Sequence, residues 1–356
     1  MKLLILTQKV DRSDSNLGFF HAWLIKLAAQ CEKLTVICLQ KGEYNLPANV
    51  TVLSLGKENG VSRFTYVIRF YHYIFSLRAE YDGVFVHMNQ LYVILGGFFW
   101  KMWHKKVLLW YVHRSVTWQL RLAEKLVTAI FTASIESFRL PSGKVQVVGH
   151  GIDTAVFIPP TAYPLLPPLR LVTVGRVTKA KDLATLIRSV ARVAEQVPAA
   201  GCTLTIIGEP VRADDRAYAQ GLHELVKSLG AEKIILFYGR VVHQELPQLL
   251  ASHHLFIQAS QTGSVDKAIL EPLATGLTVI SSGDAFQGGV AQDAGIETYT
   301  PRDYQELAQK IEKLYSSGIL NTPNKQGREW VKKHHNLEVL TKKIVDFFIS
   351  KPARRD

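Results

Sequence analysis

Short apolar runs rich in β-branched and aromatic residues alternate with helical patterns along the whole chain. In the first half these runs cover residues 3–7, 34–39, 50–55, 83–88, 107–112, 129–133 and 145–148. Strands separated by helices form a parallel sheet, because each helix carries the chain back to the start of the next strand. The pattern therefore predicts an α/β fold in which helices cover both faces of a parallel sheet.

A proline-rich segment divides the chain into two such series. Residues 157–170 hold five prolines in 14 positions, so they can neither continue a helix nor enter a central strand. The second series of expected strands covers residues 171–174, 203–207, 234–238, 255–257, 277–280 and 296–299. With 356 residues, the chain is long enough for two domains.

We therefore expect two consecutive doubly wound domains, residues 1–160 and 169–335, facing each other across a cleft. Open parallel sheets bind ligands at the carboxyl ends of their strands, so each domain would bring one substrate to that cleft. Residues 336–356 are expected to continue one long final helix that crosses back to the first domain.

The cysteine content and the lengths of the apolar segments indicate the cellular compartment of the protein. Three cysteines, Cys31, Cys38 and Cys202, form no metal-binding pattern and fit a reducing cytoplasm. The apolar run at the N-terminus is too short for a signal peptide. The most apolar window, residues 91–100, has about half the length that a membrane-spanning helix needs. We expect a cytoplasmic protein with no membrane span.

The positive charge is concentrated in the first half of the chain. The net charge is +12, and residues 1–165 carry 18 Lys and Arg against 10 Asp and Glu, a net +8. The segment from Ser62 to Arg78 combines arginines with aromatic residues at helical spacing. Such a helix can lie at the inner face of an anionic membrane as a peripheral contact, or hold an anionic acceptor. The alternative is a core-packing helix with a solvated basic edge; nucleic-acid binding has no motif to support it.

The segment from Thr262 to Gly276 has the form of a ligand-binding loop at the start of a helix. A helix N-terminus can hold diphosphate oxygens on its free N–H groups, here around Ser264, Asp266 and Lys267. Glu271, one turn into the helix, could accept hydrogen bonds from the hydroxyls of a ribose. The alternative is an ordinary strand–loop–helix in which Glu271 is merely buried and Asp266 only caps the helix.

A second candidate site follows the first strand of the second domain. Gly175 and Arg176 come directly after this strand, and Lys181 opens the next helix. Two cations at the mouth of a strand can neutralise a diphosphate leaving group. Solvated surface cations are the alternative.

The first domain offers weaker candidates. His113 follows a very apolar strand and could hydrogen-bond a sugar hydroxyl, although a structural histidine is common there. Gly18 would let a backbone approach a ligand at the start of the first helix. His21, His87 and His150 are weaker still. The pairs at 253–254 and 334–335 lack metal-ligand partners at useful spacing, so no metal site is expected.

Several common motifs are missing. The sequence has no G-x-G-x-x-G after a strand, no G-x-x-x-x-G-K-[ST], no G-x-S-x-G and no acidic metal cluster. Their absence argues against dinucleotide oxidoreductases, P-loop nucleotidases and α/β-hydrolases.

In combination, these features resemble the retaining glycosyltransferases of family 4 (group 1), which have the two-domain GT-B fold. The resemblance runs through MKLLILTQ, VVGHGIDTAVF, VGRVTKAKD, TIIGEP, FYGRV and LEPLATGLTVI, in that order. By resemblance Arg176 and Lys181 grip the donor diphosphate, Glu271 holds the ribose, and His113 lies near the transferred sugar. Gly208 and Gly239 match glycines of the donor domain. One departure concerns the E-x7-E motif, because its first Glu falls on Gly263; Asp266 or Lys267 is a candidate to replace it.

The resemblance implies transfer of a hexose from a nucleoside-diphosphate sugar to a saccharide or lipid-linked acceptor, with retention of configuration. It also implies a reaction without a metal or other cofactor, in the synthesis of surface polysaccharides or glycoconjugates. Two alternatives remain open. One is a nucleotide-sugar epimerase. The other is a catalytically retired GT-B module that binds a nucleotide sugar or a membrane as a scaffold, which the glycine at position 263 favours.

Overall fold

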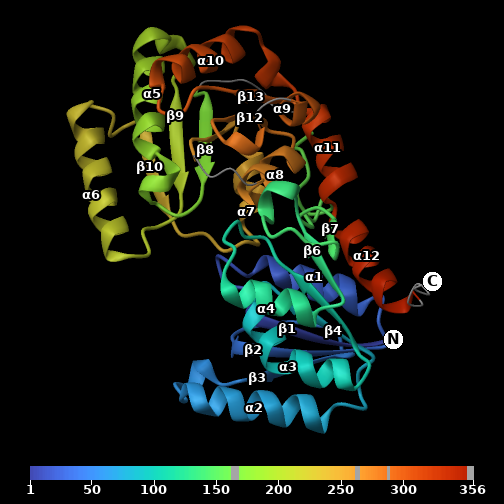
Figure 1. Ribbon diagram of the computed structural model, residues 1–356. Helices are drawn as coiled ribbons and strands as arrows, with labels where there is room; N and C mark the ends of the chain where they lie inside the picture. The colour runs from blue at the N-terminus through green and yellow to red at the C-terminus, as the bar shows by residue number, and fades with distance from the viewer. Residues whose placement is uncertain (162–167, 261–264, 287–288, 351–356) are drawn as a thin grey trace. The chain divides into compact units, whose positions relative to one another are not determined.

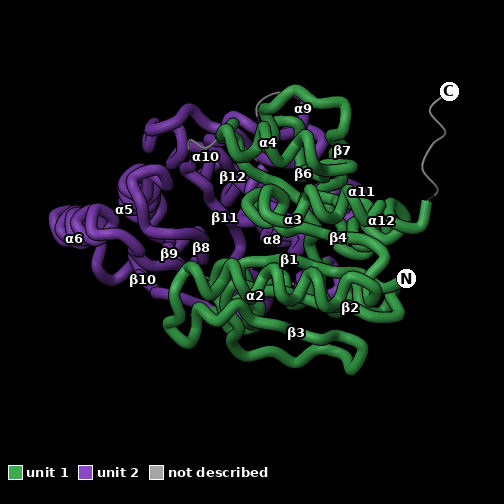
Figure 2. The backbone as a smooth tube through the Cα atoms, turned by 60° about the horizontal axis from the view of Figure 1, so that its bottom comes forward, with its two compact units in different colours: residues 1–153, 242–244, 335–356 green, residues 154–241, 245–334 purple. Residues whose placement is uncertain are grey.

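The computed structural model describes residues 1–161, 168–260, 265–286 and 289–350 (Figure 1). The chain divides into two compact units, coloured separately in Figure 2. Unit 1 holds residues 1–153, 242–244 and 335–356, and unit 2 holds residues 154–241 and 245–334. Each unit contains one parallel sheet, as the alternation of strands and helices predicts.

Unit 1 is built on a seven-stranded sheet with the order β3-β2-β1-β4-β5-β6-β7, in which every pair is parallel. Its strands are β1 (Lys2–Val10), β2 (Lys33–Lys41), β3 (Val50–Ser54), β4 (Gly83–His87), β5 (Lys106–Trp110), β6 (Ala129–Thr132) and β7 (Val145–Val147). All seven strands expected from the sequence are confirmed. The direction of winding reverses between β1 and β4, which is the switch point of this sheet.

Two cores cover the two faces of this sheet, because alternate strand residues point to opposite sides. On one face, α1 (Phe19–Ala28) and α12 (Leu337–Ile349) bury residues such as Trp23 and Ile344. On the other face, α2 (Arg63–Ser76), α3 (Gln90–Met102) and α4 (Trp118–Leu126) bury residues such as Phe70 and Trp100. Helices on both faces explain why the strands read as nearly continuous apolar runs.

The C-terminal segment differs from the single long helix that its periodicity predicts. It forms two helices, α11 (Lys325–His335) and α12, separated at Asn336. The Asn336 side chain accepts hydrogen bonds from the backbone N–H groups of Glu338 and Val339, at 2.7 and 3.2 Å. An extended residue with such a side chain is an N-cap, so the helix ends and a new one starts. Residues 335–356 belong to unit 1, where α12 packs beside α1.

Unit 2 is built on a six-stranded parallel sheet with the order β10-β9-β8-β11-β12-β13. Its strands are β8 (Arg170–Val174), β9 (Thr203–Ile207), β10 (Ile235–Gly239), β11 (Leu255–Gln258), β12 (Thr278–Ser281) and β13 (Ile296–Thr298), again at the expected places. Its helices are α5 (Leu183–Gln196), α6 (Ala213–Ser228), α7 (Leu246–Ala251), α8 (Lys267–Ala274), α9 (Gly289–Asp293), α10 (Tyr304–Ser316) and α11. The core of unit 2 packs α5, α6 and α10 on one face of this sheet (Figure 1).

The proline-rich segment lies where the two series of strands separate. Residues 162–167, its middle part, lie outside the described residues. The two units divide between Asp153 and Thr154, a few residues before the first proline of the segment.

Candidate functional site

The switch point of unit 2 lies between β8 and β11, which are neighbours in the sheet and parallel. The chain leaves β8 toward α5 and leaves β11 toward α8, so these two connections start side by side at the same edge. A crevice outside the carboxyl ends of the strands at such a point is where open α/β sheets bind ligands. Both candidate segments of this domain, residues 175–181 and the start of α8, lie in these two connections.

The loop after β8 is held by a close approach of two glycines. Gly175 and Gly208 have φ of +147° and +139°, values that side chains rarely allow. A Cβ atom on Gly208 would lie 1.9 Å from the carbonyl oxygen of Gly175. Gly208 also donates its N–H to the carbonyl of Gly239 at 2.8 Å, and Gly239 again has positive φ, +84°. The three glycines therefore bring the ends of β8, β9 and β10 together.

Asp182 is a second unusual backbone position in this loop. Its φ is +42°, although it is not a glycine, and it directly follows Lys181 at the start of α5. The Thr185 hydroxyl donates to its carboxylate at 2.9 Å. Strained residues of this kind cluster at functional sites, because the surrounding structure must hold them in place.

An ion pair joins the two connections. The Nζ of Lys181 lies 2.9 Å from Oδ2 of Asp266. The other carboxylate oxygen of Asp266 accepts the backbone N–H of Ala268 at 3.2 Å, which makes Asp266 the N-cap of α8. Asp266 is therefore the helix cap that the simpler interpretation expects, and it also pairs with a predicted site residue 85 positions away.

Lys267 and Glu271 lie one turn apart on α8. Glu271 is buried, with 6% of its surface exposed. Burial lowers the pKa of Lys267 to about 7, although the negative charges of Glu271 and Asp266 oppose this shift. An amine with a pKa near neutrality can change its charge when an anion arrives. Ser264 and Gly263, the remaining predicted positions of this loop, lie outside the described residues.

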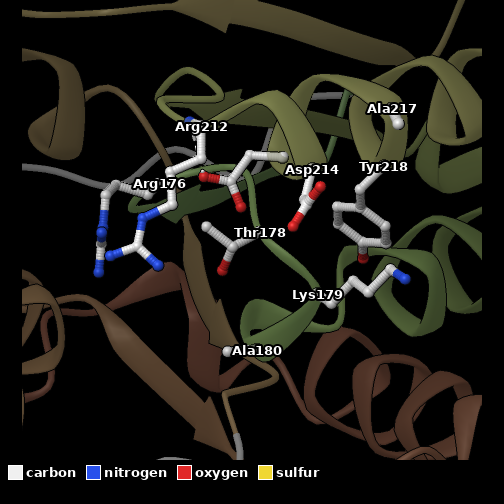
Figure 3. Close-up of a pocket in the computed structure, with 9 residues that line it drawn as sticks. Arg176, Thr178, Lys179, Ala180, Arg212, Asp214, Ala217 and Tyr218 are labelled. Carbon is white, nitrogen blue, oxygen red and sulfur yellow. Dashed lines mark hydrogen bonds between the residues drawn. The ribbon is translucent and has the colours of Figure 1, made fainter.

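Arg176 lines a pocket of about 600 Å³ that lies entirely within unit 2 (Figure 3). The pocket is also lined by Thr178, Lys179, Ala180, Arg212, Asp214, Asp215, Ala217 and Tyr218. In Figure 3 the side chains of Arg176 and Arg212 lie near each other at one end of the pocket. Within the described part of the chain, the Arg176 guanidinium has no hydrogen bond or ion pair, so it is available to an anion.

Sequence patterns alone did not indicate the side of this pocket that α6 provides. Arg212 precedes α6, and its backbone N–H donates to the carboxylate of Asp215 at 3.0 Å. The signal was present, since a cation followed by two acids comes four residues after Gly208. Such a pattern is also an ordinary helix start, so only the position beside Arg176 marks it as part of a pocket.

The candidates of unit 1 have local structural roles. His113 comes three residues after β5, is exposed, and accepts the N–H of Ser115 on Nδ1 at 3.1 Å. Gly18 has an ordinary helical φ of −56° at the start of α1. A Cβ on Gly18 would lie 2.4 Å from the carbonyl oxygen of Asp14, so the packing of its own loop already requires a glycine.

The three weaker histidine candidates have partners within unit 1. His21 accepts the N–H of Asn45 at 3.1 Å. His87 is buried, lies 3.2 Å from the Thr7 hydroxyl and stacks on Phe20. The N–H of His150 donates to the ring of His335 at 3.1 Å.

The cysteines are buried, and burial raises the thiol pKa of Cys31 to about 11 and of Cys38 and Cys202 to about 12. Thiols that stay protonated are poor nucleophiles. Within the ranges that the structure describes, no three His, Cys, Asp or Glu side chains gather as a metal site.

Comparison with known proteins identifies the domain that carries the switch-point site. Residues 168–317 match the profile of the family "Glycosyl transferases group 1". Among curated proteins, a component of the phosphatidylinositol N-acetylglucosaminyltransferase of Arabidopsis thaliana is 26% identical over 219 residues, which are 60% of this chain and 46% of that protein. The chain spans less than half the length of the curated relatives it matches.

Solved structures resemble the chain over almost its full length. The Anabaena protein Alr3699/HepE, in complex with UDP and glucose, has a TM-score of 0.75 at 17% identity, over 99% of this chain and 100% of that chain. Sucrose-phosphate synthase from Thermosynechococcus elongatus has a TM-score of 0.75 at 16% identity, over 98% of each chain. Two parallel-sheet Rossmann-like domains with these neighbours confirm the GT-B fold. Residues 168–317 are thus a glycosyl transferases group 1 domain within a GT-B chain.

Proposed function

We propose that the chain is a retaining glycosyltransferase of family 4 that moves a hexose from a nucleoside-diphosphate sugar to a saccharide or lipid-linked acceptor. The observation that carries the proposal is the set of residues at the switch point of unit 2. Arg176 without a protein partner in the described residues, the Lys181–Asp266 pair and buried Glu271 lie at the edge where such sheets bind ligands. The Anabaena protein of similar fold was solved in complex with UDP and glucose.

The proposed reaction mainly requires neutralisation of the negative charge on the leaving group. When the bond from the sugar to the diphosphate breaks, negative charge develops on the leaving oxygen. Arg176 supplies a guanidinium to that charge, and Lys181 supplies an ammonium once it exchanges Asp266 for the diphosphate. Glu271 accepts hydrogen bonds from the ribose hydroxyls. Lys267 becomes protonated, and so positively charged, when the diphosphate binds. The leaving diphosphate takes the proton of the acceptor hydroxyl, so the reaction needs neither a protein base nor a metal.

The remaining roles complete the proposal. His113, whose Nδ1 accepts a backbone N–H, carries its proton on Nε2 when neutral and can donate it to a hydroxyl of the transferred sugar. Gly18 is proposed to contribute to the donor site through the backbone of its loop, at the start of α1. The proposed setting is the synthesis of surface polysaccharides or glycoconjugates at the cytoplasmic face of a membrane, with peripheral contact through the segment from Ser62 to Arg78.

The first experiment identifies the donor. Thermal shift and sugar release are measured with UDP, GDP, ADP and their sugars, with and without magnesium. Stabilisation by one nucleotide together with release of its sugar supports the transferase, and the anomeric configuration of the product tests retention. An altered sugar on the released nucleotide supports an epimerase instead. Binding of a nucleotide sugar without turnover supports the retired scaffold.

Substitution of Arg176 tests the site itself. We expect Arg176→Ala to lower kcat/KM about a hundredfold, because one donor to a developing oxyanion contributes about 2–4 kcal/mol. Arg188→Ala is the matched control, since Arg188 is an exposed cation on α5 of the same unit. A loss below about tenfold for Arg176→Ala contradicts its role, given that scale of contribution.

A further inference from the structure

Two helices of unit 1 expose more apolar surface than packing explains. On α2, the exposed fractions of Phe64 and Ile68 are 74% and 52%. On α3, those of Leu91, Phe98 and Met102 are 50%, 64% and 53%. Together with Phe75, these residues are called here the α2–α3 face. Soluble proteins rarely leave this many large apolar side chains together in water unless the surface binds something.

The two helices present these residues on one continuous surface. Phe75 of α2 packs against Phe99 and Trp103 of α3, with ring centroids 4.9 and 5.0 Å apart. The Tyr71 hydroxyl donates to the Leu95 carbonyl at 3.2 Å. Figures 1 and 2 both show α2 and α3 side by side.

The core does not need the exposed residues. Both helices already bury another stripe against the sheet, which includes Phe70 and Ile74 of α2 and Val93 and Trp100 of α3. Within α2 the spacing from Phe64 to Ile68 is four residues, and within α3 the spacing from Leu91 to Phe98 is seven. Each helix is therefore apolar on two sides, one toward the core and one toward the surroundings.

The charged residues within the two helices have one sign. Neither α2 nor α3 contains an Asp or Glu. Arg63, Arg78 and Lys101 are exposed near the helix ends. Arg69 is instead turned toward the protein, where its Nη1 donates to the Leu55 carbonyl at 3.1 Å.

We propose that the α2–α3 face binds the surface of an anionic lipid bilayer, with both helices lying in the plane of the membrane. Apolar and aromatic side chains enter the acyl boundary while the arginines and the lysine meet anionic headgroups. In the described part of the chain no helix is long and apolar enough to cross a membrane. A two-helix surface that includes α3 extends the membrane setting of the proposed function beyond α2 alone.

The positive charges of α2 and α3 disfavour a second copy of this chain as the partner that binds the α2–α3 face. In a symmetric dimer through this face, Arg63, Arg78 and Lys101 would meet the same cations of the partner, with no acid on either helix to pair them. An anionic bilayer matches both the positive charge and the exposed apolar side chains.

The test is co-sedimentation of the full chain with vesicles of phosphatidylcholine, with or without phosphatidylglycerol. We expect binding to the anionic vesicles that weakens as salt rises. The double variant Phe64→Ser, Phe98→Ser should bind at least about tenfold more weakly, because each ring loses a buried apolar surface. The control is Ile319→Ser, which removes a 52% exposed apolar side chain from unit 2 and should leave binding unchanged.

A charge variant, Arg63→Gln with Lys101→Gln, should lose the preference for anionic vesicles while its circular dichroism stays unchanged. The proposal is overturned if the wild type does not bind anionic vesicles or if the phenylalanine variant binds as well as the wild type. It is also overturned if light scattering shows a dimer that the same variant dissociates. The assay needs neither donor nor acceptor, so its outcome is independent of the transferase proposal.

Discussion

Gly208 is the residue whose identity the site constrains most clearly. Its φ is +139°, and a Cβ atom there would lie only 1.9 Å from the Gly175 carbonyl oxygen, which leaves no space for a side chain. A substitution must separate the ends of β8 and β9, and with them the loop that carries Arg176.

We therefore predict that Gly208→Ala destabilises unit 2 by about 2–4 kcal/mol, from backbone strain and the clash together. The matched control is Gly221→Ala in α6, where nothing beyond the chain neighbours and the nearby backbone of the helix itself lies within 4 Å of the new methyl group. That change should stabilise by up to about 1 kcal/mol, because alanine favours a helix. Urea unfolding measures both, and equal stabilities for the two variants contradict the account.

Lys267 links the site to pH. Its pKa is about 7 in the folded protein against 10.5 for an ordinary lysine, because burial disfavours its charge. Between these two values the unfolded chain binds more protons than the folded one. The free energy of unfolding therefore rises with pH in this window, by at most about 1.4 kcal/mol per pH unit.

Lys267→Met should remove that rise in the free energy of unfolding. All other titrating groups are the same in the two proteins, so the difference in stability between wild type and variant reports Lys267 alone. Unfolding in urea at pH 7 and pH 9 measures it. Parallel changes of stability in the two proteins mean that Lys267 keeps an ordinary pKa.

At the scale of elements, α12 gives the strongest example of distant sequence completing a core. It follows the last helix of unit 2 along the chain, yet Leu337, Leu340 and Ile344 are at most 1% exposed within the core of unit 1. The Lys26–Glu338 ion pair, at 2.7 Å, lies on the exposed rim of the same contact between α1 and α12.

We predict that Ile344→Ala destabilises unit 1 by about 2–4 kcal/mol, the usual result of a large-to-small change in a core. Ile349→Ala on the same helix is the control, since 64% of Ile349 is exposed and its loss should change stability by less than about 0.5 kcal/mol. Five of the six tryptophans lie in residues 1–153, so tryptophan fluorescence reports the unfolding of unit 1. Similar effects of both changes indicate that α12 does not pack as described.

At the scale of the whole molecule, the same strand order occurs twice. The order β3-β2-β1-β4-β5-β6 of unit 1 repeats as β10-β9-β8-β11-β12-β13 in unit 2, so each sheet has its own switch point. Their residues differ: the switch point of unit 2 has Arg176 and the Lys181–Asp266 pair, whereas that of unit 1 has buried His87 at the end of β4, beside Thr7 of β1.

We predict from this difference that a nucleoside diphosphate slows amide hydrogen exchange after β8 and β11 and at the start of α8. Peptides from α2 and α3 should exchange at an unchanged rate. Mass spectrometry after exchange, with and without the nucleotide, measures this. Protection confined to the loops after β1 and β4 assigns the nucleotide to unit 1 instead.

Much of the fold could be predicted from the sequence. Each of the thirteen expected strands has a counterpart in the structure, because strands buried on both faces read as short apolar runs between turn residues. The break at Asn336 was missed, since apolar periodicity continues through it and only the cap geometry ends the helix. For the site, Arg176, Lys181 and Asp266 could be named from their positions after strands. The roles of all these residues in binding and catalysis stay predictions, and Ser264 and Gly263 also lie outside the described residues.

The sequence by itself determined the strands and the two parallel sheets, because burial patterns and turn residues are local properties of the chain. Only the tertiary structure decided the partners of the site residues. Lys181 and Asp266 are 85 positions apart, and they meet because β8 and β11 became neighbours in the sheet. The same holds for the pocket beside Arg176, which needs α6, and for the α2–α3 face, which exists only once two helices pack together. Contacts between distant segments depend on the order of strands, and no local pattern encodes that order.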